Sequence, residues 1–334
     1  MPGSRPPIVD PAQTRPAAQG PHTCPERAVG DDFAERLCAR SKPALRRSGT
    51  VGFPEAERAV PSMTYASIMV SVDLAGDAGG RIKIAAHLAD AFEGRTIGVA
   101  AHLPDHVAPM VLSIGASGLY PAVPRAVVVD GLARAQDLFW VAVGDRSRVS
   151  WRAGLEPGLA FLASQARAAD LIVVGRGDGD EATACPFPLN AASVVLAAGR
   201  PVLVVPPGID HLDGRCAMVA WKDTREARRA VLDALPILRM ASRVDVVAVT
   251  CADHPSGAAD VAAYLSTHGI HATSAEHRSE GVSDAETLLE LASGYSADLI
   301  VMGAYGHSRM REMVLGGVTR DVLRHSPICS LLSH

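Results

Sequence analysis

The sequence predicts an α/β protein built on parallel sheets, and three observations support that prediction. From Met63 onward, short apolar runs alternate with amphipathic stretches, which is the pattern of βαβ units with right-handed crossovers. Hydrophobic residues make up 48% of the 334 residues and aromatic residues only 4%, as suits an aliphatic parallel sheet buried on both faces. The pattern also occurs twice along the chain.

The last third of the chain contains five apolar runs that we expect to be strands. They lie at 216–221, 244–249, 270–276, 298–303 and 327–332. The segments between them have helical periodicity. The apolar positions that share one helix face are Ala227, Val231, Ala234 and Leu238 in the first of these segments, and Ala285, Leu288, Leu289 and Ala292 in another.

The first half repeats this order of elements. The run "ADLIVVG" at 169–175 matches "ADLIVMG" at 297–303 with an offset of 128, whereas "SIMVSVDL" at 67–74 takes the place of "CAMVAWKD" at 216–223 with an offset of 149. The two offsets differ by 21, so the first half carries about 21 extra residues before its fourth strand. We place them in 104–147, with "LFWVAV" in an added or lengthened helix.

Residues 1–62 have a different composition from the remainder. They are rich in Pro, Ala, Arg and Gly and show no apolar period, so they cannot bury enough surface to offset their ordering entropy. We expect a disordered extension or a start codon assigned too early, with Met63 as the natural start. The expected domains are then 63–208, closed by "RPVLVVPPG" at 200–208, and 214–334.

Several classes of function receive no support from composition. A formal net charge of −4 gives no reason to expect nucleic acid as a partner, and no apolar run approaches the roughly 20 residues of a membrane helix. The six cysteines are scattered without a C-x-x-C pair and the histidines form no H-E-x-x-H motif, so neither a disulfide framework nor a zinc site is predicted. We expect a cytoplasmic protein with reduced thiols, and no residues suggest a catalytic group.

The stretch "GAYGHSRMREMVLGGVTRDVL" at 303–323 joins an expected strand to an expected helix. Glycines in such a turn can serve backbone freedom alone. Two separated glycine clusters also let two backbone segments approach one anion, because free N–H groups and the positive helix end meet there. Neither the Walker A motif nor the G-x-G-x-x-G fingerprint is present.

The glycine spacing resembles that of the universal stress protein (UspA) family, whose ATP-binding members carry G-x2-G-x9-G-[S/T] after the fourth strand. Gly303, Gly306 and Gly316 fit this pattern, and Gly317 stands where the family has Ser or Thr. The resemblance extends over about residues 64–334 as two tandem domains. It implies two doubly wound domains, each a five-stranded parallel sheet of order 3-2-1-4-5 with helices on both faces. It also implies an internal pseudo-dimer formed by the fifth strands, "PVLVV" against "PICSLL", with further homodimerisation left open.

The resemblance further implies ATP, or another adenine nucleotide, as the ligand of the second half. The implied base and ribose contacts are Ala220, Trp221, Lys222, Val249, Met302 and Gly303. The implied phosphate contacts are Gly306, His307, Gly316, Gly317, Val318 and Thr319. Lys222 stands where the family has an Asp beside the ribose, so either Lys222 contacts a phosphate instead or Asp223 substitutes after a register shift. For Trp221 the alternative is a place in the core or at its rim, and for His307 a solvated place on the loop.

The first half has the opposite combination of features. Asp73 ends its first strand as the family pattern requires, and Gly175 is kept, but the second glycine cluster is missing. Asp178, Asp180 and Glu181 add negative charge where phosphate would bind, and like charges repel. That acidic run is either a solvated loop or a site for a hard cation. We expect this half not to hold ATP.

The sequence leaves three hypotheses about function. The leading hypothesis is a tandem stress protein that binds an adenine nucleotide in its second half and acts as a regulatory or protective module. The first alternative is a module of the same fold that binds no nucleotide and works through dimerisation or interaction. The second alternative is a slow nucleotide hydrolase or phosphotransferase, against which the absence of a candidate base counts.

Overall fold

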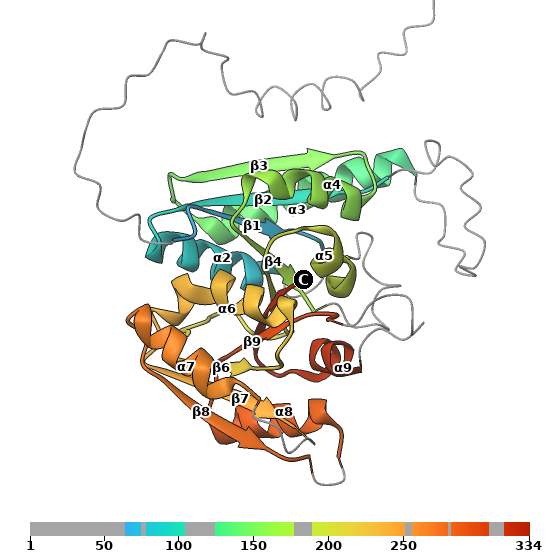
Figure 1. Cartoon of the computed structure of the whole chain (residues 1–334). Helices are drawn as coiled ribbons and strands as arrows, with labels where there is room; N and C mark the ends of the chain where they lie inside the picture. Colours follow the sequence, from blue (N-terminus) through green and yellow to red (C-terminus); the bar gives the residue numbers. More distant parts are fainter. Residues whose placement is uncertain are drawn as a thin grey trace, which may run out of the picture. The chain divides into compact units, whose positions relative to one another are not determined.

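The computed structural model describes residues 64–74, 78–103, 124–176, 189–250, 256–279, 282–306 and 317–334. The predicted disordered extension, residues 1–62, lies outside these described residues. Figure 1 shows the described elements coloured along the chain.

The described strands form one ten-stranded sheet. Those of the first half are β1 (Ser67–Ser71), β2 (Arg95–Ala101), β3 (Val149–Gly154), β4 (Leu171–Gly175) and β5 (Val202–Val205). Those of the second half are β6 (Cys216–Ala220), β7 (Arg243–Val249), β8 (Ala272–His277), β9 (Leu299–Gly303) and β10 (Cys329–Ser333). All five runs predicted as strands in the last third are strands.

The strand order is β3-β2-β1-β4-β5-β10-β9-β6-β7-β8. Within each half every pairing is parallel, so each half has the predicted order 3-2-1-4-5. Hydrophobic strands buried on both faces are what a parallel sheet requires, and β1 and β10 are buried at all five of their positions. The predicted fold class is confirmed.

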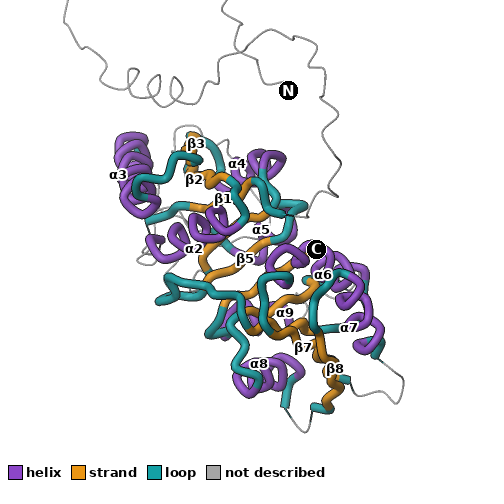
Figure 2. Tube along the Cα trace, turned by 90° about the vertical axis from the view of Figure 1, so that its left-hand side faces the viewer, coloured by secondary structure: helices purple, strands orange, loops and turns teal. Residues whose placement is uncertain are grey.

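Helices cover both faces of this sheet, as Figure 2 shows for the trace as a whole. The helices of the first half are α2 (Ala78–Ala91), α3 (Arg125–Val143), α4 (Gly158–Gln165) and α5 (Ala191–Ala197), with a 3-10 turn at Ala166–Ala168. Those of the second half are α6 (Arg225–Leu238), α7 (Ala258–Thr267), α8 (Asp284–Gly294) and α9 (Gly317–His325).

One apolar core runs through both halves on one face of the sheet. It joins residues of α4 and α5 to residues of α8 and α9 across the strands between them. The helices α2, α3, α6 and α7 supply the rest of the cover, with α2 against β1, α6 against β9 and β10, and α7 against β8. Each half therefore buries its sheet on both sides, as doubly wound folds do.

Local sequence explains where several helices begin. Thr224, Ser283 and Asn190 precede α6, α8 and α5, and each side-chain oxygen accepts a hydrogen bond from a backbone N–H of the first turn. The predicted helix faces are largely correct, since Ala227, Val231, Ala234 and Leu238 are all buried. Leu289 is only partly buried, whereas its predicted companions on α8 are buried.

The extra residues of the first half lengthen a helix, as predicted. Helix α3 has 19 residues and contains "LFWVAV", whereas α7 at the corresponding place has 10. Phe139 of α3 is fully buried and stacks against Trp151 of β3, with ring centroids 5.4 Å apart. Both rings pack against Gly98 of β2, where an added β-carbon would lie 2.7 Å from an atom of each ring.

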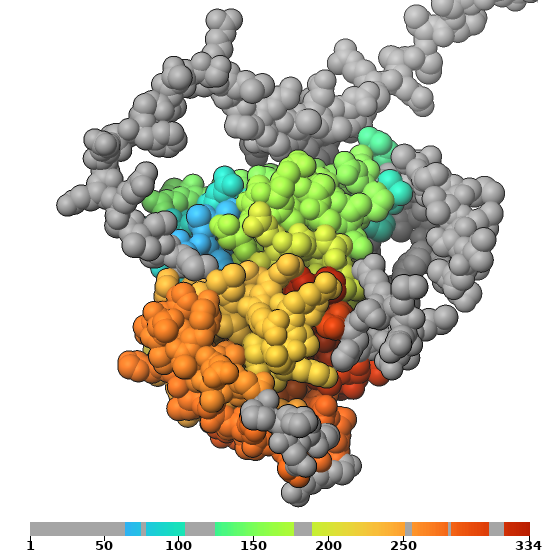
Figure 3. All heavy atoms as spheres, in the orientation of Figure 1, coloured from blue at the N-terminus to red at the C-terminus, as the bar shows by residue number. Residues whose placement is uncertain are grey.

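The two halves meet through their fifth strands. Strand β10 pairs antiparallel with β5, with Leu331 opposite Leu203, and both side chains are fully buried. Beyond the sheet, the Tyr65 hydroxyl donates a 2.5 Å hydrogen bond to the Asp233 carbonyl of α6. Figure 3 shows the gold surface of the second half directly against the green surface of the first. The pairing of "PVLVV" with "PICSLL" is thus present, while the boundaries 63–208 and 214–334 stay a prediction.

We expect Leu331→Ala to destabilise the whole described fold rather than one half. The substitution leaves a cavity where two sheets join, and such changes cost about 2–5 kcal/mol. Thermal unfolding measures it: a single transition should move to lower temperature. The exposed Val141→Ala on α3, a residue 81% exposed, is the control and should change stability by less than about 0.5 kcal/mol. Two separated transitions in Leu331→Ala would show that the halves unfold independently.

Candidate functional site

The predicted site lies at the point where the strand order of the second half reverses. Strand β6 pairs with β7 on one side and β9 on the other, so the loops after β6 and β9 diverge to helices on opposite faces. Ligands of open α/β sheets bind outside the carboxyl ends of the strands at such a switch point. The sequence-predicted residues come from the ends of β6, β7 and β9 and from the start of α9.

Three of the predicted base contacts lie on one face of the sheet at this edge. Ala220 is in register with Met302, and Val249 ends the neighbouring strand β7. Ala220 and Met302 are buried in the core beneath α8 and α9, while Val249 is only partly buried against it. The structure therefore brings these residues together, and of the three Val249 is the most accessible.

Trp221 belongs to the rim of the core. Its side chain is 7% exposed, and its indole Nε1–H donates a 2.9 Å hydrogen bond to the Ser256 carbonyl just before α7. A buried indole with its N–H satisfied has a structural task. Of the two interpretations of Trp221, packing between the end of β6 and the start of α7 is the one that these contacts support.

The residues at the position where the family has an Asp beside the ribose are exposed to solvent. Lys222 and Asp223 are both exposed, and Asp223 forms an ion pair with Arg228 of α6. The Lys222 carbonyl accepts a 2.7 Å hydrogen bond from the Thr224 N–H, which forms a tight turn into α6. Asp223, which lies just before α6, is therefore bound to an arginine of that helix.

The glycines after β9 lie against the start of α6. A β-carbon at Gly303 would lie 2.6 Å from the Glu226 carbonyl carbon, and one at Gly306 would lie 3.0 Å from Glu226 Oε2. Between them Tyr305 has a φ of 59°, in the left-handed region that most side chains avoid. Both glycines thus allow close approach of loop and helix, which is a packing role.

The second glycine cluster is partly within the described residues. His307 and Gly316 lie outside them, as does the segment between. Gly317 is exposed at the start of α9, and a β-carbon there would meet no atom of the described residues within 4 Å. Val318 packs partly on the core and Thr319 is buried. Open space at the N-terminus of α9 is where free N–H groups can receive an anion.

Sequence reasoning missed an ion pair beside this loop. Glu226 is 2% exposed, and its Oε1 accepts a hydrogen bond from Nε of Arg225, whose side chain is 84% exposed. Burial is the largest single effect and raises the pKa of Glu226, but the hydrogen bond from Arg225, the charge of Arg225 and further hydrogen bonds from the backbone and Thr224 together bring that pKa below its usual value. A signal was present: Glu226 shares a helix face with Ala230 and Ala234, which are both buried.

Comparison with known proteins identifies the fold at this point. Residues 217–332 match the model of the Universal stress protein family. The second half of this chain belongs to the universal stress protein family. No curated protein matched the sequence.

Solved structures extend the likeness of fold to both halves. A universal stress protein from Archaeoglobus fulgidus has a TM-score of 0.58 at 13% identity, over 80% of this chain and 95% of its own. A universal stress protein in complex with cAMP covers 42% of this chain and 96% of its own, at 20% identity and a TM-score of 0.28. The universal stress protein from Archaeoglobus fulgidus in complex with dAMP covers 42% of this chain and 98% of its own, at 19% identity and a TM-score of 0.28.

The corresponding edge of the first half is occupied by an arginine. Asp73, predicted from the strand-one position, forms an ion pair with Arg81 of α2, and the two residues are 8% and 3% exposed. Arg81 Nε also donates a 2.9 Å hydrogen bond to the Ser71 carbonyl. A β-carbon at Gly175 would collide with the Arg81 guanidinium. The carboxylate that the universal stress protein pattern places near a ribose is bound within the protein.

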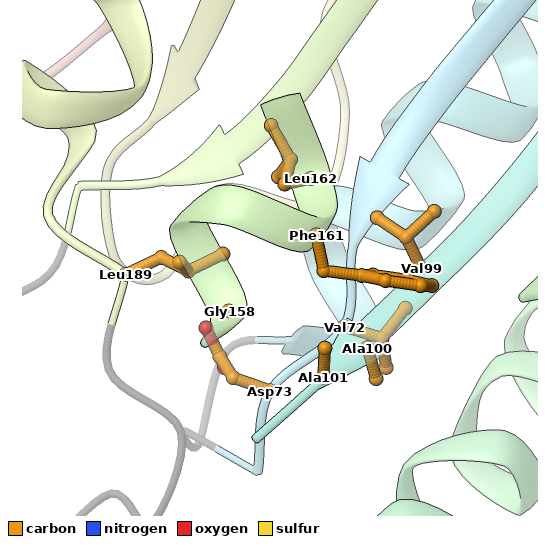
Figure 4. A pocket seen from close by; sticks show the side chains of 9 residues that line it. All are labelled: Val72, Asp73, Val99, Ala100, Ala101, Gly158, Phe161, Leu162 and Leu189. Carbon is orange, nitrogen blue, oxygen red and sulfur yellow. The ribbon is translucent and has the colours of Figure 1, made fainter. Parts of the chain in front are cut away.

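Little room remains around Asp73. The cavity there has a volume of about 10 Å³, enough for about one water molecule. Figure 4 shows that helix α4 closes it with Phe161 and Leu162, opposite Val72 and Val99. A nucleotide cannot enter such a space without movement of α4. The predicted acidic run, Asp178, Asp180 and Glu181, lies outside the described residues.

A larger hollow lies away from the predicted site. Its volume is about 570 Å³, and it opens between β8 and α8 at the outer edge of the second half, lined by residues including His277, Thr287 and Tyr295. None of the predicted nucleotide contacts lines it.

Among the described residues no three His, Cys, Asp or Glu side chains are grouped so as to hold a metal ion, and no described helix is long and apolar enough to cross a membrane.

We expect Arg81→Met to be strongly destabilising, because it leaves the Asp73 carboxylate buried without its partner. Breaking a buried ion pair from one side costs about 3–5 kcal/mol. The double variant Arg81→Met with Asp73→Asn removes both charges and should recover much of that loss. Urea unfolding of the single and double variants measures the difference. A double variant no more stable than Arg81→Met would mean that the Arg81 contacts to backbone, and not the ion pair, maintain this edge.

Proposed function

We propose that the second half binds ATP, or another adenine nucleotide, at the carboxyl edge of β6 and β9. The tandem then acts as a regulatory or protective module of the stress response. The base would lie near Val249 and Met302, and the phosphates near Gly306 and the N-terminus of α9.

The observation that carries this proposal is the N-terminus of α9 at the switch point of a universal stress protein domain. No described residue lies within 4 Å of a β-carbon at Gly317, and the helix end directs N–H groups and a positive dipole outward from it. The first half provides the contrast. There the same edge is closed by Arg81 and α4, and no second glycine cluster follows β4.

The alternative, a module of the same fold that works without nucleotide, has one observation in its favour. Gly303 and Gly306 lie against α6, so their lack of side chains is explained without a ligand. Lys222, which stands where the family has an Asp beside the ribose, also favours this alternative. A nucleotide hydrolase receives no comparable support, because the described residues at this edge include no general base placed beside the open helix end.

Titration calorimetry of the full chain with ATP tests the proposal. The expected result is one nucleotide per chain, and mass spectrometry of the denatured protein should detect adenine nucleotide carried through purification. Two equivalent sites would contradict the role assigned to Arg81 and α4. No heat of binding with ATP, ADP or AMP would favour the interaction module.

Gly317→Ser should strengthen ATP binding. The new hydroxyl enters open space at the start of α9, and one further hydrogen bond to a charged phosphate would tighten binding by about ten-fold. Gly317→Ala is the matched control, since it adds the β-carbon without the hydroxyl and should leave affinity within about two-fold. Calorimetry compares the three proteins. Equal affinities for Ser and Ala would place the phosphates elsewhere.

A further inference from the structure

Helix α6 begins with a cation at its positive end. Arg225 is the first residue of α6, where the helix dipole disfavours positive charge. Its side chain is nevertheless fixed, because Nε donates a hydrogen bond to the Glu226 carboxylate. The guanidinium is 84% exposed while Glu226 is 2% exposed. A buried carboxylate thus anchors an exposed arginine at the mouth of the switch point.

The anchor also contacts the glycine loop. Among the described residues Glu226 Oε2 has no hydrogen-bond partner in good geometry, and it would lie 3.0 Å from a β-carbon at Gly306. A buried charged oxygen without a donor is costly to the fold. The ion pair therefore lies between the first turn of α6 and the loop after β9, at the edge where the phosphates are proposed to bind.

We propose that Arg225 binds the phosphate groups of the nucleotide and that Glu226 is the positioning residue that aims it. This inference rests on the proposed function of the same site. The bond to Glu226 uses Nε, and no described residue is recorded as accepting a hydrogen bond from the terminal Nη groups of Arg225. A guanidinium presents such donors in a planar fork suited to phosphate.

The other arginines at this end of α6 are less suited to the task. Arg228 is in an ion pair with Asp223, and Arg229 donates to the His334 carbonyl. Arg229 is linked to the loop through a main-chain oxygen rather than a carboxylate, since His334 in turn hydrogen-bonds the Ala304 carbonyl and its ring lies 6.4 Å from that of Tyr305. Arg228 is 61% exposed and belongs to the same helix, which makes it a matched control for charge.

Calorimetry of the full chain with ATP and with adenosine tests this inference. Arg225→Ala should weaken ATP binding by at least about ten-fold, with adenosine affinity unchanged, because adenosine has no phosphate. Arg228→Ala should leave both affinities within about two-fold. Arg225→Lys should recover only part of the loss, since a lysine keeps the charge but not the planar fork.

Glu226→Gln tests the positioning role. It should weaken ATP binding but not adenosine binding, and it should have no effect when Arg225 is already alanine. A merely structural role would instead lower both affinities in either background. If Glu226→Gln fails to fold, the exposed Arg225→Ala decides alone, with its unfolding midpoint as the check on folding.

The outcomes separate this inference from the proposed function. If the unaltered chain binds ATP and Arg225→Ala binds it equally well, the role of Arg225 is overturned and the proposed function stands. A similar loss in Arg228→Ala would also overturn it, since general positive charge would then explain the effect. If the unaltered chain binds neither ATP nor adenosine, both proposals fail together.

Discussion

The antiparallel pairing of β5 with β10 is the constraint on which the rest of the arrangement depends. Each half is a parallel sheet, so all of its strand ends point to one edge. Because the junction strands run in opposite directions, the carboxyl edges of the two halves point in opposite directions. The two candidate edges cannot share one ligand, and each can change independently. The paired residues Val202 and Leu332 of these strands belong to the one core that runs through both halves.

The two halves differ at the first turn of two corresponding helices, α2 and α6. In α2 a buried cation, Arg81, faces a buried anion, Asp73, and the edge is closed by its own ion pair. In α6 the buried group is the anion, Glu226, and its cationic partner Arg225 is exposed. The buried Arg81 therefore closes the edge of the first half, whereas the exposed Arg225 presents positive charge to solvent at the edge of the second half.

Much of the fold could be predicted from the sequence, because period and repetition are local signals. The offset between "ADLIVVG" and "ADLIVMG" located matching strands, and the excess residues led to the long helix α3. The direction of individual side chains could not be predicted in the same way. Arg81 lies on a helix face with Ile84, Ala85 and Leu88, all buried, which marks a buried charge, but only tertiary structure identifies Asp73 as its partner. Trp221 likewise satisfied two interpretations until its bond to Ser256 was known.

The glycines illustrate how packing and ligand binding can impose the same residue. Gly303 lacks a side chain because α6 lies against it, and Gly306 because Glu226 does. That packing does not argue against a ligand, since it is what carries Arg225 to the same edge as the N-terminus of α9. A larger residue at Gly306 would push on Glu226 first and on the orientation of Arg225 second. Under the proposed function, loss of ATP binding in such a variant would come through Arg225, because the spacing of Gly303 and Gly306 also fits the first turn of α6.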